Sequence, residues 1–269
     1  MSDTPPIVLV FAATDPSGGG GMPSDILTLA SMGCHALTVV TAITVQDTMG
    51  IEAVMPIEAD WVADQARCVL EDMPVAAFKL GVLGSAENAT VIAALLSEYP
   101  PRPLVFDPVL ASGRGDTLAS SATVEVLLDS VLPLTTVLTP NSVEARRLAG
   151  AAPGADLAEC AARLIARGAA YVLITGTHEA DADVVNTLYG PDGARHAHTW
   201  KRLAGSYHGS GCTLASAIAA QLALGQPVAD AVLAAQDYTW RALQAGFQPA
   251  DGQFLPCRFH AAHSREAVP

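Results

Sequence analysis

The chain has 269 residues, 51% of them hydrophobic, which is ample for one large core, and we expect a single domain over residues 1–269. Its net charge of −13 arises from 14 basic and 27 acidic side chains, with no block of Lys or Arg. This balance argues against binding to nucleic acid or to anionic membranes. A bound phosphate must therefore be held by helix N-termini, backbone amides and a metal ion rather than by lysines.

The sequence also indicates where the protein works. It contains no run of about 18 uncharged apolar residues, so we expect no membrane-spanning helix. The N-terminal stretch MSDTPPIVLVFAAT lacks a basic region and is not typical of a signal peptide. The five cysteines form no C-x-x-C pair, which indicates neither a zinc site nor a disulfide framework. We therefore expect a cytoplasmic protein.

Apolar, β-branched segments alternate with helical patterns along the chain. Strands are predicted over residues 7–13, 36–45, 76–83, 103–110, 135–141 and 171–177, with a hairpin over 184–190 and 195–201. Helices are predicted over 24–32, 60–73 (with Asp60 as N-cap), 87–99, 123–132, 143–148, 157–167, 212–224 and 228–246. This alternation predicts an α/β fold with a parallel sheet covered on both faces. Ligands of such sheets bind at the carboxyl ends of the strands, so candidate site residues are expected there.

The first predicted strand is followed by ATDPSGGGG, residues 13–21. Four consecutive glycines lose much backbone entropy on folding, which indicates a close approach of the backbone to a ligand or a mobile hinge, beyond a tight turn. The run fits neither a Walker loop nor a dinucleotide-binding pattern. Asp25 follows on the next helix, where the helix dipole favours an acid. Gln46 ends the second strand, where it either offers an amide to the edge of a heterocycle or is an ordinary loop residue.

Two further strand ends carry acidic and amide side chains. Asp107 lies at the end of the 103–110 strand, and Asn141 and Glu144 follow the 135–141 strand. Asn141 and Glu144 have the spacing of a capping box, which is sufficient as a structural explanation. Oxygen atoms gathered at this edge could equally hold water around a magnesium ion. The residues alone leave both interpretations open.

The stretch HGSGCTLASAIAAQLALG places Gly209, Ser210 and Gly211 directly before Cys212, at the start of a long helical pattern. The glycines allow a turn whose amides converge, and the helix dipole adds about half a positive charge. This predicts a pocket for an anion that develops during a reaction. A thiol there is expected to have a pKa below its usual value of about 8.5. The alternative is a small residue buried at a helix start, and the absence of G-x-S-x-G disfavours a hydrolase nucleophile.

Taken together, the chain resembles the hydroxymethylpyrimidine and phosphomethylpyrimidine kinases of the thiamine pathway, which are ribokinase-like enzymes. The resemblance extends over about residues 7–245 and rests on motifs in the same order: DPSGGGG, TAITVQDTMG, KLGVLG, DPVLASGRG, TPNSVEA and HGSGCTLASAIAA. It includes the element TPN-x-x-E and a cysteine where most ribokinase-like enzymes carry aspartate.

The resemblance implies a ribokinase-like three-layer α/β/α sandwich with a central, mostly parallel sheet. It implies that the γ-phosphate of ATP passes, with Mg²⁺, to the hydroxymethyl group of an aminopyrimidine and then to its monophosphate. By similarity, Asp25 and Gln46 face the pyrimidine, and Val82 and Val109 line its pocket. A homodimer is also implied.

The resemblance assigns the phosphate side of the site as well. Asn141 and Glu144 organise magnesium and the ATP phosphates, with Asp107 as a second metal contact. Gly209, Ser210 and Gly211 form the anion hole, and Cys212 takes the proton of the attacking hydroxyl.

One departure concerns the segment ITGTH, residues 174–178, where family members commonly read M-K-G-G-H. Thr175 therefore stands in the nucleotide site where a phosphate-binding lysine is usual, and Arg114 or Lys201 are candidate replacements. The loop DGQFLP, residues 251–256, also departs from the usual Gly-Pro-rich form. Two alternatives follow: a pyridoxal or pyridoxine kinase, or a catalytically weakened pyrimidine-binding module.

Overall fold

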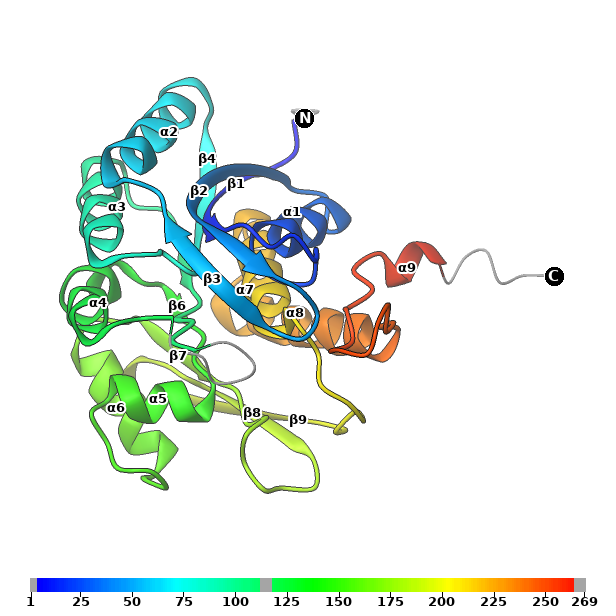
Figure 1. Ribbon diagram of the computed structural model, residues 1–269. Coiled ribbons are helices and arrows are strands. Elements are labelled where there is room, and N and C mark those ends of the chain that lie inside the picture. The colour runs from blue at the N-terminus through cyan, green and yellow to red at the C-terminus, as the bar shows by residue number, and fades with distance from the viewer. Residues whose placement is uncertain (1–3, 112–117, 264–269) are drawn as a thin grey trace.

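The computed structural model describes residues 4–111 and 118–263, and its strands form one nine-stranded sheet in the order β3-β2-β1-β4-β5-β6-β7-β8-β9 (Figure 1). The strands are β1 (Ile7–Ala13), β2 (His35–Gln46), β3 (Ile51–Pro56), β4 (Val75–Leu80), β5 (Leu104–Phe106), β6 (Val137–Leu138), β7 (Tyr171–Ile174), β8 (Val184–Tyr189) and β9 (Arg195–Trp200). The helices are α1 (Gly21–Ser31), α2 (Ala59–Asp72), α3 (Ala86–Glu98), α4 (Ser121–Val126), α5 (Ser142–Leu148), α6 (Leu157–Ala166), α7 (Ser210–Ala223), α8 (Val228–Gln244) and α9 (His260–His263).

In the sheet, the neighbours β2-β1-β4-β5-β6-β7 pair in parallel. The outer strands β3, β8 and β9 pair antiparallel with their neighbours. The seven residues of β1 are all buried, because helices cover both faces of the sheet. Leu9 and Phe11 share one core with residues of α2, α3, α5 and α6. Val8 and Val10 belong to a second core with residues of α1, α7 and α8. The predicted mostly parallel sheet between two helical layers is therefore confirmed.

Several elements differ from the prediction in their bounds or in their type. The sequence analysis missed β3, a largely exposed strand that exists through its antiparallel pairing with β2. Strands β5 and β6 are shorter than predicted, since the chain leaves the sheet before Pro108 and Pro140. The predicted helix over 123–132 is divided into α4, a π-helical turn and a 3₁₀ turn. Asp60 lies in the first turn of α2, and the N-cap position belongs to Glu58.

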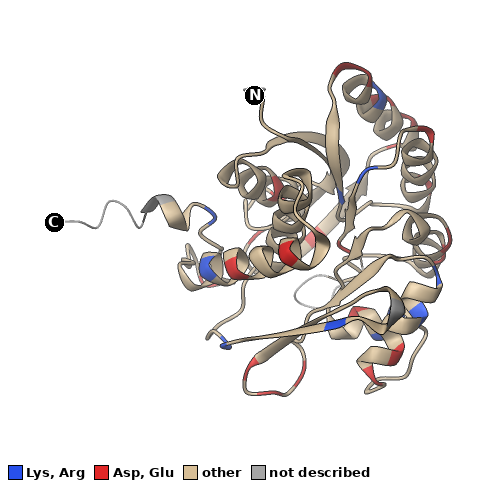
Figure 2. Ribbon diagram, turned by 180° about the vertical axis from the view of Figure 1, so that it is seen from behind, with Lys and Arg blue, Asp and Glu red and all other residues tan. Residues whose placement is uncertain are grey.

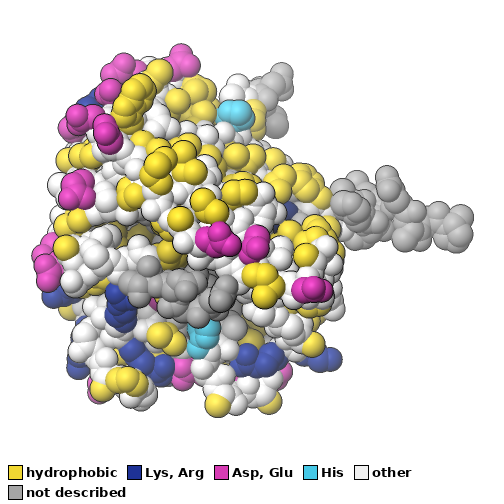
Figure 3. All heavy atoms as spheres, viewed as in Figure 1, with side chains coloured by type: hydrophobic (Ala, Val, Ile, Leu, Met, Phe, Trp, Pro, Cys, Tyr) yellow, Lys and Arg dark blue, Asp and Glu magenta, His cyan; other side chains and the backbone are white. Residues whose placement is uncertain are grey.

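The surface is acidic and carries one apolar region. Acidic side chains are spread over several helices and connecting loops (Figure 2). Hydrophobic side chains gather on the face that β2 and β3 cross (Figure 3), including Ile43, Val45 and Met55 with exposed fractions of 44%, 55% and 58%. All five cysteines are free. In the part of the chain that the structure describes, no helix has both the length and the apolar character needed to cross a bilayer.

Candidate active site

The candidate site lies where the carboxyl ends of β1, β4, β5 and β6 meet the start of α7. Backbone bonds hold these strand ends side by side: the Gly81 amide donates to Phe11 (2.9 Å), and the Asp107 amide donates to Leu80 (2.9 Å). The first turn of α7 closes over them, because a Cβ atom added at Gly211 would lie 3.5 Å from Oδ2 of Asp107. The structure thus brings Asp107, which directly follows β5, next to the GSGC turn.

The glycine run after β1 packs against the turn that precedes α7. Gly209 has a left-handed backbone (φ 77°), and a Cβ atom there would overlap the carbonyl oxygen of Gly19. A Cβ atom at Gly19 would overlap the ring of His208. The glycine run therefore allows a close approach of the backbone to the turn before α7, whereas the expected approach to a ligand remains a prediction.

A polar network ties this packing to the end of β2. Nε2 of His208 lies 2.6 Å from Oδ2 of Asp15 and 2.9 Å from the side-chain amide nitrogen of Gln46. Burial favours a higher pKa for Asp15, but hydrogen bonds from His208, Ser17 and the Gly20 amide hold it below its usual value. His208 therefore shapes the turn and contacts Gln46, which is half-buried at this edge.

A buried ion pair lies beneath the site. Lys79 on β4 and Asp25 on α1 are both fully buried, with Nζ 2.9 Å from Oδ2. The other oxygen of Asp25 accepts a bond from the Ser216 hydroxyl on α7 (2.7 Å). Burial alone would lower the pKa of Lys79, but the negative charge of Asp25 raises it above its ordinary value. Burial raises the pKa of Asp25, and the charge of Lys79 and the hydrogen bonds from Lys79 and Ser216 oppose that shift. Because both carboxylate oxygens are hydrogen-bonded, we assign opposite charges to the pair, which fixes β4, α1 and α7 to one another.

This arrangement corrects the role expected of Asp25. The predicted contact with a pyrimidine requires an accessible carboxylate, whereas Asp25 has an exposed fraction of 0% and both of its oxygens are bonded within the protein. Helix α1 begins at Gly21, earlier than predicted, which places Asp25 inside the helix and toward the sheet. In the structure, Asp25 is the ion-pair partner of Lys79.

Cys212 lies half-buried in the first turn of α7. Burial raises the pKa of its thiol to about 12; Lys79 opposes this shift, and the carboxylates of Asp107 and Asp25 add to it. The sequence-based expectation of a lowered pKa is therefore wrong for the protein without ligands. The helix dipole was correctly placed, but burial of the thiol outweighs it, with smaller contributions from the carboxylates of Asp107 and Asp25.

Asn141 and Glu144 form the predicted capping box at the start of α5. Oδ1 of Asn141 accepts from the Glu144 amide (2.9 Å), and Oε2 of Glu144 accepts from the Asn141 amide (2.9 Å). Oε1 of Glu144 accepts from the Leu110 amide (3.2 Å), which attaches the chain after β5 to α5. Burial and the charge of Asp107 raise the pKa of Glu144 to about 8.

The acids at this edge have properties that suit a magnesium ion. Burial raises the pKa of Asp107 to about 6, although Lys79 and the Cys212 thiol act in the opposite direction. Oδ2 of Asp107 is buried without a hydrogen-bond partner among the described residues. The described residues contain no cluster of three or more metal-ligating side chains. Magnesium commonly uses one or two carboxylates together with water and substrate phosphates, and Asp107 and Glu144 fit that pattern.

The remaining predicted residues lie around the same edge. Val82 and Val109 are half-buried just beyond β4 and β5. Thr175 is half-buried beside the start of α5: its amide donates to Pro140 (3.0 Å), and its carbonyl accepts from Ser142 (3.1 Å). Of the suggested replacements for the missing lysine, Lys201 lies after β9, and Arg114 falls outside the described residues.

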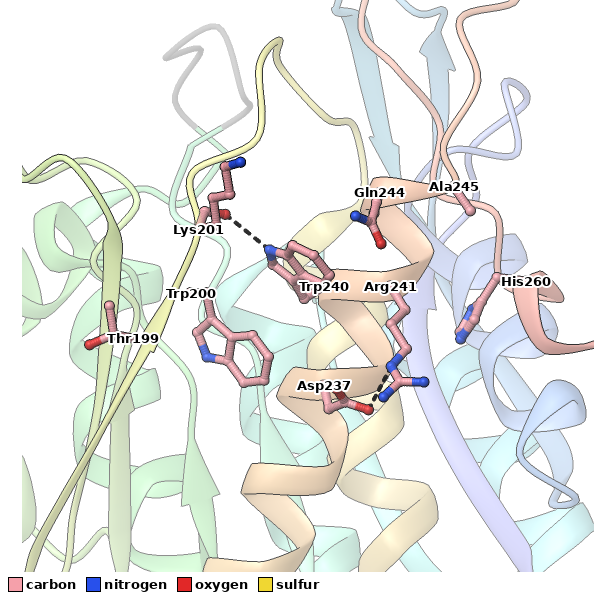
Figure 4. A pocket seen from close by; sticks show the side chains of 9 residues that line it. All are labelled: Thr199, Trp200, Lys201, Asp237, Trp240, Arg241, Gln244, Ala245 and His260. Carbon is pink, nitrogen blue, oxygen red and sulfur yellow. Dashed lines mark hydrogen bonds and ion pairs between the residues drawn. The ribbon is translucent and has the colours of Figure 1, made fainter. Parts of the chain in front are cut away.

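A depression of about 550 Å³ lies between the end of β9 and α8 (Figure 4). Trp200 and Trp240 face each other there with ring centroids 6.4 Å apart. The indole nitrogen of Trp240 donates to the carbonyl of Lys201 (2.9 Å), so both segments are held together at its rim. The chain runs from Lys201 directly to the GSGC turn, which places the depression next to the site along the sequence.

Sequence reasoning missed four residues of this site. They are Asp15, Lys79, His208 as a contact of Gln46, and Arg258, whose guanidinium donates to the carbonyls of Gly18 and Gly19. A lysine inside the apolar strand AAFKL was a usable signal, because a buried lysine requires a partner. The carboxylate in DPSGGGG was a weaker signal, since Asp is common in turns.

The fold and the site define a class of protein, the ribokinase-like small-molecule kinases. The crystal structure of an ADP complex of Bacillus subtilis pyridoxal kinase superposes with a TM-score of 0.88 and 26% identity, covering 97% of this chain and 100% of that one. Residues 15–256 match the family described as phosphomethylpyrimidine kinase. The chain belongs to this family and is a kinase, a phosphotransferase.

Two relatives support this assignment. The hydroxymethylpyrimidine/phosphomethylpyrimidine kinase of Streptomyces coelicolor is 40% identical over 253 residues, which cover 93% of each chain. The crystal structure of phosphomethylpyrimidine kinase from Clostridium difficile 630 has 32% identity and a TM-score of 0.77, covering 87% of this chain and 97% of that one.

Proposed function

We propose that this kinase transfers the γ-phosphate of ATP to the hydroxymethyl group of 4-amino-5-hydroxymethyl-2-methylpyrimidine and then to the resulting monophosphate, as a step of thiamine biosynthesis. The observation that carries the proposal is the convergence of Cys212, the glycine turn before it, Asp107 and Glu144 at one sheet edge in a member of this family. Phosphoryl transfer depends mainly on positioning and charge stabilisation, which the backbone amides and a magnesium ion held by the acids would provide.

The proposed roles follow from the geometry. Gly209, Ser210 and Gly211 present the free amides of a helix start to the transferring phosphoryl group. Cys212, as the thiolate, accepts the proton of the attacking hydroxyl late in the transfer and becomes the neutral thiol. Gln46, held by His208, offers its side-chain amide to the pyrimidine edge, and Val82 and Val109 flank the ring.

Asp107 and Glu144 are the proposed contacts of Mg²⁺, and Asn141 holds Glu144 in place. When bound, Mg²⁺ would neutralise these acids and part of the phosphate charge. With Asp107 neutralised, one of the charges that raise the pKa of the Cys212 thiol is removed. A larger fraction of Cys212 would then be thiolate, the form that accepts a proton, in the loaded enzyme than in the free one.

We expect the raised pKa of Glu144 to make stability depend on pH. The folded protein binds this proton more tightly than the unfolded chain, so the associated stability is complete below about pH 4.5 and is lost as pH rises through about 8. Urea unfolding from pH 5 to 8.5 in EDTA should therefore show a steeper loss for the wild type than for Glu144→Gln. Magnesium with ATP should flatten the wild-type curve. Parallel curves for the two proteins would contradict the expectation.

We propose that the adenine of ATP lies in the depression between β9 and α8, where Trp200 and Trp240 offer ring faces. Its phosphates then extend along residues 201–209 toward the glycine turn and pass near Thr175. Threonine at position 175 supplies no charge to them.

Thr175→Lys is expected to lower the KM for ATP about five- to tenfold, the effect of one added hydrogen bond to a charged group. Steady-state kinetics at saturating pyrimidine measure this change, with Thr177→Lys as the matched control on the exposed residue two positions further on. An unchanged KM in Thr175→Lys would show that another cation already serves the phosphates.

The substrate is tested by comparing kcat/KM for hydroxymethylpyrimidine, its monophosphate and pyridoxal under identical Mg-ATP conditions. We expect the pyrimidines to be preferred. Pyridoxal kinase activity is the alternative favoured by the fold similarity to the Bacillus enzyme, and a clear preference for pyridoxal would establish it. Tight pyrimidine binding without transfer would instead support a weakened binding module.

We further propose a homodimer, a single domain over residues 1–269 and a cytoplasmic location. The exposed apolar face of the β2–β3 ribbon supports the dimer, because Ile43 pairs with Met55 across the strands and both side chains remain exposed (Figure 3). Sedimentation equilibrium measures the oligomeric state directly.

A further inference from the structure

The segment Phe254–Arg258 crosses back over the glycine turns from the C-terminal side. Phe254 stacks on Tyr207 with ring centroids 5.5 Å apart, just before the GSGC turn. The Cys257 amide donates to Ala242 (2.8 Å), and the Arg258 carbonyl accepts from the hydroxyl of Tyr238 (2.7 Å), so α8 holds this segment in place. It ends with the side chain of Arg258 inside the protein, where its exposed fraction is 5%.

All three nitrogen atoms of the guanidinium donate hydrogen bonds, two to the glycine turn after β1 and one to helix α7. Nη1 donates to the carbonyl of Gly18 (3.3 Å), and Nη2 donates to the carbonyl of Gly19. Nε donates to Oγ1 of Thr213 on α7 (3.2 Å). Arg258 therefore joins the loop after β1 to the helix that carries Cys212.

These bonds fix the orientation of the glycine peptides. The carbonyls of Gly18 and Gly19 point to Arg258, while the amide of Gly20 donates to Asp15 on the other side (2.6 Å). Thr213 in turn donates to the carbonyl of Gly209, the first residue of the proposed anion hole (2.8 Å). A displacement of the guanidinium would release the Gly18–Gly20 turn from the start of α7.

The charge of Arg258 is not matched locally. Among the residues that the structure describes, the ion pairs do not include Arg258, and its hydrogen-bond acceptors are carbonyls and a hydroxyl. A buried cation without a carboxylate is costly, so its field is available to anions nearby. Cys212, Asp25 and Asp15 are within its electrostatic reach.

We propose that Arg258 is a positioning residue for phosphoryl transfer: its fork holds the glycine turn after β1 against the start of α7 and places a positive charge behind the anion hole. This inference rests on the proposed role of Gly209, Ser210 and Gly211. It also explains how a chain with a net charge of −13 and no lysine at position 175 keeps positive charge near a phosphate.

The test compares Arg258→Gln, Arg258→Lys and the control Arg67→Gln, an exposed arginine on α2. Rates are normalised to the folded fraction from thermal unfolding. We expect Arg258→Gln to lower kcat about tenfold or more with less than a threefold change in the KM for ATP. Arg258→Lys should recover only part of kcat, because lysine keeps the positive charge but loses the hydrogen bonds of the planar guanidinium. Unchanged kcat in folded Arg258→Gln, or full recovery by lysine, would overturn the positioning role.

A second readout does not depend on the substrate. Iodoacetamide labelling followed by peptide mass analysis gives the rate at Cys212 relative to Cys68, which is exposed on α2. Loss of the positive charge in Arg258→Gln should lower this ratio, and an unchanged ratio would contradict the electrostatic part of the proposal. Failure of the proposed function is seen separately, as wild-type protein that does not phosphorylate the pyrimidines. In that case kcat is compared with pyridoxal as the substrate, and the labelling test still applies because it needs no substrate.

Discussion

Replacing Cys212 with alanine is expected to lower turnover about 100-fold while changing the pyrimidine dissociation constant less than threefold. The thiol sits where the amides of α7 and the carboxylate of Asp107 meet, so its loss removes the proton acceptor and leaves the binding residues in place. Initial rates with Mg-ATP and calorimetric titration of the pyrimidine measure the two quantities.

The matched control is Cys68→Ala, because Cys68 is exposed on α2, away from the site. This variant should have wild-type turnover. Wild-type turnover in Cys212→Ala would remove the base role, and a parallel loss of binding would show that the thiol shapes the pocket instead.

Lys79→Met is expected to lower the free energy of unfolding by about 3–5 kcal/mol. The substitution leaves the carboxylate of Asp25 fully buried with only the Ser216 hydroxyl as partner, next to the burial-raised acid Asp107. Chemical denaturation at pH 7 measures the change, and loss of the protein from the soluble fraction would be consistent with its upper end.

The double variant Lys79→Met, Asp25→Asn separates the charge effect from the packing effect. Without either charge, no uncompensated ion remains, so we expect the double variant to be more stable than Lys79→Met alone. If the two changes instead add, the pair does not interact and the account of the buried network is wrong.

The parts of the site that the sequence predicted depend on local signals. Prolines, glycines and capping residues mark the strand ends, so Asp107, Asn141, Glu144 and the GSGC turn were found from short stretches. The capping box was predicted from a spacing of three residues and is present with both of its hydrogen bonds. The same local reasoning gave the parallel strands of the core, because buried strands are apolar throughout.

The parts that were missed or wrong depend on contacts between distant segments. Lys79 and Asp25 are 54 positions apart, and Arg258 and Gly19 are 239 positions apart. The pKa of Cys212 was predicted in the wrong direction, since the burial that raises it, and the acids that add to the shift, come from other strands and helices. Strand β3 was missed because it is exposed and is defined by its partner rather than by its own pattern.

We expect this chain to phosphorylate one pyrimidine twice at the sheet edge. Phosphorus NMR of the protein with Mg-ATP and hydroxymethylpyrimidine follows both transfers in one sample. A phosphomonoester signal should rise first, followed by a diphosphate signal, with one ADP released for each transfer. ATP that remains intact, or hydrolysis to inorganic phosphate without any phosphorylated pyrimidine, would contradict this expectation.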